Sequence, residues 1–225
     1  MADTELADLT EATTLAAGDL LYTVIDPAGT PLDRKVTHAG VFPQFAQIPA
    51  SGDFLVASGG STTTSNGVDV YEREHAVPIY VPAALTFTGI ACYVDTLTAS
   101  SVVRLGIRAK STTIAGPGSL ILDAGTVSSA ATGAKEITIS QALDRGWYWL
   151  TATMQAVTGA RLRGFANTYA SPFGAVITAA AGAAQATAPS NQVWTVSAVT
   201  GALAADPTWS LLNDVNSIPV LWLKR

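Results

Sequence analysis

Short runs of alternating apolar and polar residues, separated by Gly, Pro, Ser and Thr, recur along this chain and most constrain its fold. In residues 102–110 this alternation predicts a strand with an aliphatic face and a basic face, namely Val103, Leu105 and Ile107 against Arg104, Arg108 and Lys110. We expect the aliphatic face to pack in a core and the basic face to be solvated. Only a short N-terminal segment, capped by Thr4 and ended by Gly18, has a weak helical pattern. The sequence therefore predicts an all-β protein.

Further segments repeat the alternation and extend it into a sheet. Ile90, Cys92 and Val94 share one side of a predicted strand, and residues 146–154 are apolar on both sides, which is typical of a central strand. Residues 218–225 are predicted to close a sheet and to bring Trp222 into the core. From Tyr71 onward the strands are spaced by roughly ten to fifteen residues, which indicates an antiparallel β-sandwich.

The N-terminal part has a different pattern. Residues 19–26 and 33–37 are predicted to form the strands of a small hairpin around a turn at 27–31. Residues 57–67 are rich in Gly, Ser and Thr, as flexible links are. We therefore expect an N-terminal segment over 1–45, a linker or long loop over 46–70 and a β-sandwich domain over 71–225.

Composition and charge exclude several classes of protein. The longest apolar stretch, 173–184, is too short to span a bilayer, which needs about 20 residues. A net charge of −5 without a run of Lys or Arg argues against nucleic acid as a partner. The acidic N-terminus is unlike a signal peptide. One cysteine and two histidines argue against a disulfide and a structural zinc site, so we expect no metal and no cofactor.

The candidates for catalysis are few. His75 follows Tyr71, Glu72, Arg73 and Glu74, and this segment is read either as an acid/base or metal cluster or, preferably, as a solvated, charged strand. His38 is expected at a chain reversal, and Cys92 is expected to be a buried apolar thiol rather than a nucleophile. The acidic residues cannot be paired as glycosidase carboxyls from the sequence. We therefore expect a protein that is not an enzyme.

The opening of the chain is similar to a known class of protein. Residues 9–26 read Leu-Thr-Glu-Ala-Thr-Thr-Leu-Ala-Ala-Gly-Asp-Leu-Leu-Tyr-Thr-Val-Ile-Asp, and residues 31–37 read Pro-Leu-Asp-Arg-Lys-Val-Thr. This series resembles the N-terminal segment of many tailed-bacteriophage virion proteins, particularly tail fibres, in which it commonly joins the appendage to the particle. The resemblance implies the anchor residues Leu9, Asp19, Leu20, Leu21, Tyr22, Arg34 and Lys35.

A second resemblance lies in the predicted sandwich. Residues 117–127 read Pro-Gly-Ser-Leu-Ile-Leu-Asp-Ala-Gly-Thr-Val, and they are followed by Thr-Gly at 132–133, Glu-Ile-Thr-Ile at 136–139 and Gly-Trp-Tyr-Trp-Leu at 146–150. The series resembles the β-sandwich of phage fibre and minor structural proteins, which is itself similar to carbohydrate-binding modules. It implies a jelly-roll or carbohydrate-binding-module-like sandwich after the anchor hairpin.

Together the resemblances imply a non-enzymatic virion structural protein of a phage or phage-like particle, assembled in the host cytoplasm. Its leading role is a tail fibre or tail-tip component that projects the β-sandwich for host attachment. The alternative is a head fibre or capsid decoration protein, and a glycan-degrading enzyme is a distant third. Other virion proteins are expected to bind the N-terminal segment, and a homotrimer is expected by analogy.

A host surface glycan is a further expected partner. Sugars present apolar faces that stack on aromatic rings, so the ligand-binding candidates are aromatic residues in loop-like surroundings, namely Tyr169, Phe173, Trp194 and Trp209. Large aromatic side chains are also mostly buried, so at least half of these four are expected in the core. The apolar segment 171–184 is expected to be either an exposed interface or a packed crossover loop.

Overall fold

The computed structural model describes residues 20–25, 32–37, 48–57, 67–114, 116–166, 191–215 and 217–225. The chain divides into two compact units, Met1–Gln47 and Ile48–Arg225. Within the described residues the structure consists of strands, turns and irregular segments and contains no helix, so none is available to cross a membrane.

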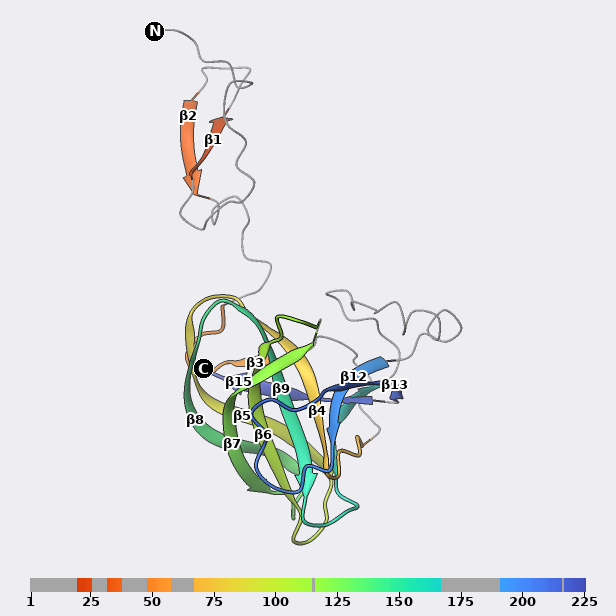
Figure 1. Cartoon of the computed structure of the whole chain (residues 1–225). Helices are drawn as coiled ribbons and strands as arrows, with labels where there is room; N and C mark the ends of the chain where they lie inside the picture. Colours follow the sequence, from red (N-terminus) through yellow and green to blue (C-terminus); the bar gives the residue numbers. More distant parts are fainter. Residues whose placement is uncertain are drawn as a thin grey trace. The chain divides into compact units, whose positions relative to one another are not determined.

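The first unit contains a hairpin of β1 (Leu20–Ile25) and β2 (Leu32–Thr37), which pair antiparallel (Figure 1). This pairing confirms the hairpin expected near the N-terminus. Tyr22 lies opposite Lys35, so the backbone brings the Leu-Leu-Tyr strand beside the basic return strand. Of the expected anchor residues, β1 carries Leu20, Leu21 and Tyr22, and β2 carries Arg34 and Lys35. Leu9, Asp19, His38 and the short N-terminal segment with a helical pattern lie outside the described residues.

The second unit is an antiparallel β-sandwich, as predicted. Sheet 1 has the order β10-β5-β15-β3. β8 also pairs with β5, along the edge opposite to β15. Its strands are β3 (Phe54–Val56), β5 (Leu85–Thr96), β8 (Gly133–Leu143), β10 (Arg161–Leu162) and β15 (Leu221–Lys224).

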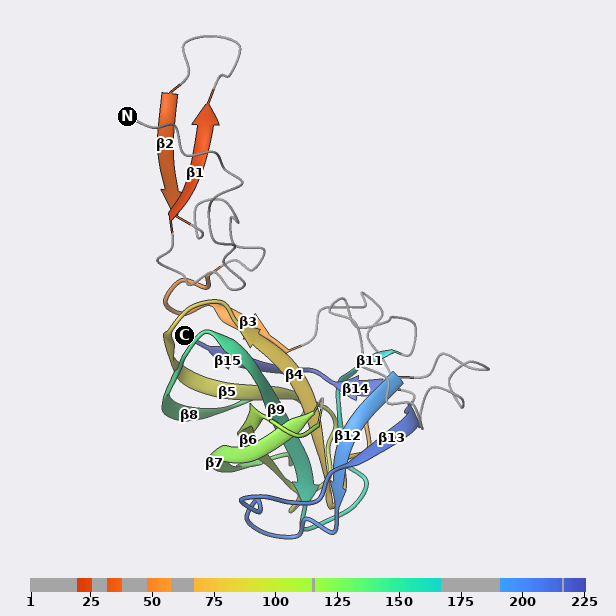
Figure 2. The same cartoon turned by 45° about the horizontal axis from the view of Figure 1, so that its top comes forward.

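Sheet 2 has the order β13-β12-β4-β9-β6-β7. Its strands are β4 (Arg73–Val81), β6 (Val102–Lys110), β7 (Pro117–Ser128), β9 (Gly146–Gln155), β12 (Asn191–Ser197) and β13 (Ser210–Val215). In Figure 2, β12 and β13 lie at one end of this sheet, and β6 and β7 lie at the other. A short additional pair joins β11 (Gly164–Ala166) to β14 (Ser217–Pro219).

The hydrophobic core lies between the two sheets. On β6 the predicted inward residues Val103, Leu105 and Ile107 are fully buried. On β5 the expected apolar face is also fully buried, as are Leu150 and Met154 on β9. These side chains alternate along their strands because successive residues of a strand point to opposite sides of the sheet. The predicted core faces are therefore confirmed.

The outer face of sheet 2 differs from the prediction. β9 lies between β4 and β6, which confirms it as a central strand. Thr151 and Thr153, which alternate with its core residues, are buried too. On β6, Arg108 is completely buried and Arg104 is half-buried, whereas Lys110 is exposed. The solvated basic face expected for this strand was wrong, because another segment of the chain covers it.

The charged segment that begins β4 also departs from expectation. Glu74 and His75 are 1% and 2% exposed, although we preferred a solvated strand for this segment. Arg73 alone of the three consecutive residues is exposed. The prediction was wrong because β4 lies between β9 and β12, and both of its faces are covered at this level.

The C-terminal strand is interrupted at Val220, which separates β14 from β15. β15 pairs with β5 on one side and β3 on the other. Leu221 and Leu223 fill the core, while Trp222 points to the other side, where it is half-buried and meets Phe54 edge-to-face with ring centroids 6.4 Å apart. The expectation that Trp222 lies in the core was wrong, because its neighbours Leu221 and Leu223 occupy the side of the strand that faces the core.

Part of the region expected to be a linker contributes to the sandwich. β3 pairs with β15, and Ala57 at its end is fully buried. Val68 and Val70 also belong to the hydrophobic core. Residues 48–57 and 67–70 therefore belong to the second unit.

The C-terminal strand yields a stability prediction. We expect Leu223→Ala to lower the free energy of unfolding by about 2–5 kcal/mol, because the side chain is fully buried and the change leaves a cavity. Trp222→Ala should cost less, because Trp222 is only partly buried and lies outside the core that Leu223 fills. Denaturant unfolding of the full chain measures both values. A larger loss for Trp222→Ala would contradict this account of the strand.

Candidate functional site

A segment between β12 and β13 covers the outer face of sheet 2, and we call residues 198–209 the strap. Gln155 on β9 donates hydrogen bonds from Nε2 to the carbonyls of Val199 and Gly201, at 3.0 and 2.7 Å. The amide of Leu120 on β7 donates to the carbonyl of Ala205 at 2.9 Å. The strap is therefore fastened at both ends to strands of sheet 2, over which it loops in blue in Figure 1.

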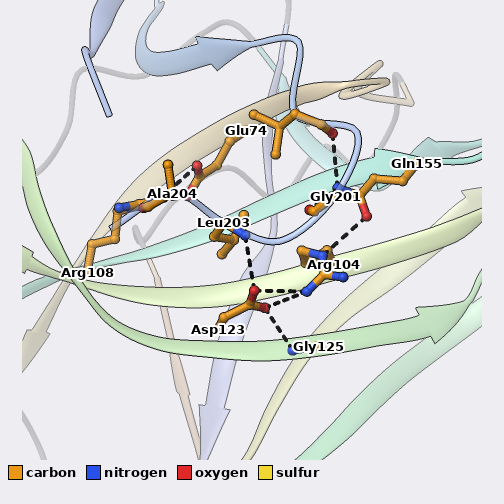
Figure 3. A network of polar contacts seen from close by, with 10 residues as sticks. Glu74, Arg104, Arg108, Asp123, Gly125, Gln155, Gly201, Leu203 and Ala204 are labelled. Atoms are coloured by element: carbon orange, nitrogen blue, oxygen red, sulfur yellow. Dashed lines mark hydrogen bonds and ion pairs between the residues drawn. The ribbon is translucent and has the colours of Figure 1, made fainter. Parts of the chain in front are cut away.

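A buried ion pair lies beneath the strap. Arg108 on β6 donates from Nε and Nη2 to the two carboxylate oxygens of Glu74 on β4, at 2.7 and 3.0 Å. Arg108 also donates from Nη2 to the carbonyl of Ala204 at 3.0 Å (Figure 3). A bidentate pair with additional hydrogen bonds offsets part of the large desolvation penalty of two buried charges. The pair therefore joins two strands of the sheet to the strap.

A second polar cluster holds the middle of the strap. Arg104 donates from Nη1 to both carboxylate oxygens of Asp123 on β7, at 2.9 and 2.8 Å. The amides of Leu203 and Gly125 each donate to this carboxylate at 3.0 Å (Figure 3). Partial burial by itself raises the pKa of Asp123, but these amides and Arg104 outweigh it and hold the pKa below its usual value. Asp123 is therefore a charged anchor point for the strap.

Gly106 makes room for the apolar contact between these clusters. Leu203 of the strap is almost completely buried, and a Cβ at Gly106 would overlap its side chain. On the outer face of β6, glycine thus stands between two arginines. The leucine occupies the space that the missing side chain leaves, so the strap approaches the strand closely.

Trp209 ends the strap directly before β13. The Arg108 guanidinium carbon lies 5.0 Å from its ring centroid, which is a cation–π contact. The ring is half-buried, and its Nε1 is buried without a hydrogen-bond partner in the described part of the chain. Trp209 is thus held on the same arginine that pairs with Glu74.

A groove of about 480 Å³ opens beside Trp209. It is lined by residues 110–114, which run from the last residue of β6 into the following turn, by residues 117–119 at the start of β7 and by residues 206–209 of the strap. Its surface combines the indole and two prolines with the hydroxyl groups of Ser and Thr, and it has one basic and one acidic residue, Lys110 and Asp206. This combination suits a ligand that has both apolar faces and many hydroxyl groups.

The four aromatic candidates from the sequence have different outcomes. Trp209 lines the groove. Trp194 on β12 is half-buried and packs near Gly116, where an added Cβ would come within 2.6 Å of its indole. It therefore packs beside the turn that leads to Pro117 and is not among the residues that line the groove. Tyr169, Phe173 and the apolar segment 171–184 lie outside the described residues.

Sequence reasoning missed the strap and its polar anchors. Glu74 and Arg108 are 34 residues apart, and no local pattern connects them. The only signal on β6 was that Arg104, Gly106 and Arg108 share one face, so that the glycine leaves a space between two charged side chains. The groove was missed because its lining combines residues 110–119 with residues 206–209, which are far apart in the chain.

The other residues considered for chemistry are buried and isolated. Burial raises the pKa of the Cys92 thiol to about 12, so it is protonated at neutral pH. Burial lowers the pKa of His75 to about 4, with a further contribution from Arg73, while Asp69 opposes the shift. Neither ring nitrogen of His75 has a hydrogen-bond partner in the described ranges. No three metal-ligating side chains gather within those ranges either.

Comparisons with family models, curated proteins and solved structures found no match to this chain.

The buried pair gives a test of the strap. We expect Glu74→Ala and Arg108→Ala each to lower the free energy of unfolding by about 3–5 kcal/mol, because each leaves an uncompensated buried charge. The double variant Glu74→Leu/Arg108→Met should be more stable than either single variant. Urea unfolding measures all three.

A second ion pair of the same chain provides the control. Lys224 and Glu136 lie 3.2 Å apart and are each about one-third exposed. Lys224→Ala should change the free energy of unfolding by less than about 1 kcal/mol. Equal losses for Lys224→Ala and Arg108→Ala would contradict a structural role for the buried pair.

His75 predicts a loss of stability in mild acid. Its pKa is 6.5 in the unfolded chain and about 4 in the folded protein, so between these values only the unfolded chain takes up the proton. Stability should therefore fall as the pH drops from 6.5 to 4, by about 3 kcal/mol in total. His75→Leu should remove this slope in urea unfolding across the same range.

The acid response of Asp123 is separate from that of His75. Because the pKa of Asp123 is below 3.8, its contribution is present above that value and is lost only at lower pH. Parallel pH profiles for the wild type and His75→Leu between pH 6.5 and 4 would show that His75 does not produce the effect.

Proposed function

We propose that this chain is a non-enzymatic structural and adhesive component of a tailed-bacteriophage particle, such as a tail fibre or tail-tip protein. The division of the chain into a small N-terminal unit and a larger β-sandwich carries the proposal. The N-terminal unit holds the hairpin whose sequence resembles the docking segments of phage appendages. In this proposal the hairpin binds another virion protein, and the sandwich reaches the host surface.

The groove supports the adhesive part of the proposal. It lies on the sandwich and is formed by loops and strand ends, which are the usual positions of binding residues on a rigid scaffold. Its indole and hydroxyl groups suit recognition of a surface glycan. The strap fastens these residues to sheet 2 through hydrogen bonds, so the site is held in place before a ligand arrives.

Location in the particle tests this proposal. Purified particles of the phage that encodes this chain are labelled with a gold-conjugated antibody raised against the second unit, Ile48–Arg225, and viewed by negative-stain electron microscopy. We expect gold at the tail end. The control is a phage whose gene for this chain is deleted and which receives, from a plasmid, a shortened chain without residues 1–47. If the N-terminal unit docks the protein, particles of this control should carry no gold.

The other labelling patterns separate the alternatives. Gold around the head would replace the tail assignment with a head fibre or capsid decoration protein. Particles that carry no gold, in a preparation where the antibody detects the free protein, would refute a virion role.

A further inference from the structure

We infer that the groove beside Trp209 binds a short, neutral oligosaccharide. The inference rests on the adhesive part of the proposed function and specifies its ligand. The residues that carry it are Trp209, Asp206 and Lys110, together with the hydroxyl-bearing turn at 111–113.

The lining matches the chemistry of a sugar. A pyranose ring presents C–H groups on its faces and hydroxyl groups around its edge. Trp209 supplies an aromatic carbon surface, since it lines the groove while its Nε1 is buried. Thr112, Thr113 and Ser119 are exposed at the rim, where their hydroxyls can both donate and accept hydrogen bonds.

The walls of the groove are already ordered. Trp209 lies against Arg108, and Arg108 is fixed by Glu74 and the strap carbonyls. On the opposite wall, Ser111 Oγ accepts hydrogen bonds from the amides of Thr113 and Ile114, both at 3.1 Å. A site that is ordered in advance loses less conformational entropy on binding, which favours the weak contacts that sugars make.

The charges favour a neutral sugar over an acidic one. The groove has one basic and one acidic side chain, and the chain as a whole carries a net charge of −5. The Asp206 carboxylate is an acceptor for sugar hydroxyls, and together with the negative net charge of the chain it opposes the attraction of Lys110 for a carboxylate or sulfate group. The volume of about 480 Å³ lies within the range of about 300–1,000 Å³ typical of small-ligand sites.

Solution NMR of the full ¹⁵N-labelled chain tests this inference. The probes are maltotriose, cellotriose, mannotriose and chitotriose, with trigalacturonate as the acidic counterpart, each at about 10 mM, which saturates a millimolar site. The chain has five tryptophan indole N–H signals, and Trp209→Phe assigns the signal of Trp209. We expect at least one neutral trisaccharide to shift this signal and the amides of Thr112 and Thr113, while trigalacturonate leaves them unchanged.

Matched variants separate binding from folding. Trp209→Ala should weaken the binding of that sugar by on the order of tenfold. Asp206→Asn, at an exposed position of the strap, should weaken sugar binding severalfold while thermal unfolding stays unchanged. This variant therefore tests the groove even if Trp209→Ala does not fold. Trp222→Ala removes a half-buried tryptophan from the other sheet and should leave sugar binding unchanged.

Two results would overturn the inference. The first is an absence of groove shifts with all four neutral probes, and the second is a response to trigalacturonate alone. These results are independent of the gold labelling. If gold marks the tail but no sugar binds in the groove, only the proposed ligand is refuted. If a sugar binds but the protein is absent from particles, only the virion role is refuted.

Discussion

The bidentate pair between Arg108 and Glu74 is the interaction on which the outer half of this sandwich depends. Both charges are removed from water, so each requires the other and the surrounding carbonyls. The same guanidinium contacts the strap carbonyls and the ring of Trp209. One buried cation therefore connects two strands, the covering segment and the wall of the groove.

This arrangement covers both faces of sheet 2 where the strap crosses it. One face packs on sheet 1 through aliphatic side chains, and the other packs on the strap through hydrogen bonds, ion pairs and the contact of Leu203 with Gly106. Hydrogen bonds to charged groups are directional, whereas apolar packing is not. The polar face therefore specifies where the strap lies, and with it the position of the residues that line the groove.

Much of the fold could be predicted because strand alternation is a local property. The inward faces of β5 and β6, the central position of β9 and the N-terminal hairpin all follow from residues within one or two strands. The errors share a cause. Charged side chains on β4 and β6 were assigned to solvent, and Trp222 to the core, because composition alone does not show what covers a strand.

The sequence by itself determined an antiparallel β-sandwich with a preceding hairpin, because the alternation of apolar residues and the positions of the turn residues are local features of the sequence. It also marked Trp209 as a residue of interest. Only the tertiary structure decided that Arg108 meets Glu74, that the strap closes over both, and that residues 110–119 and 206–209, far apart in the chain, form a groove. Partners so far apart in the chain are selected by the shape and charge of the folded sheet, and no local pattern encodes them.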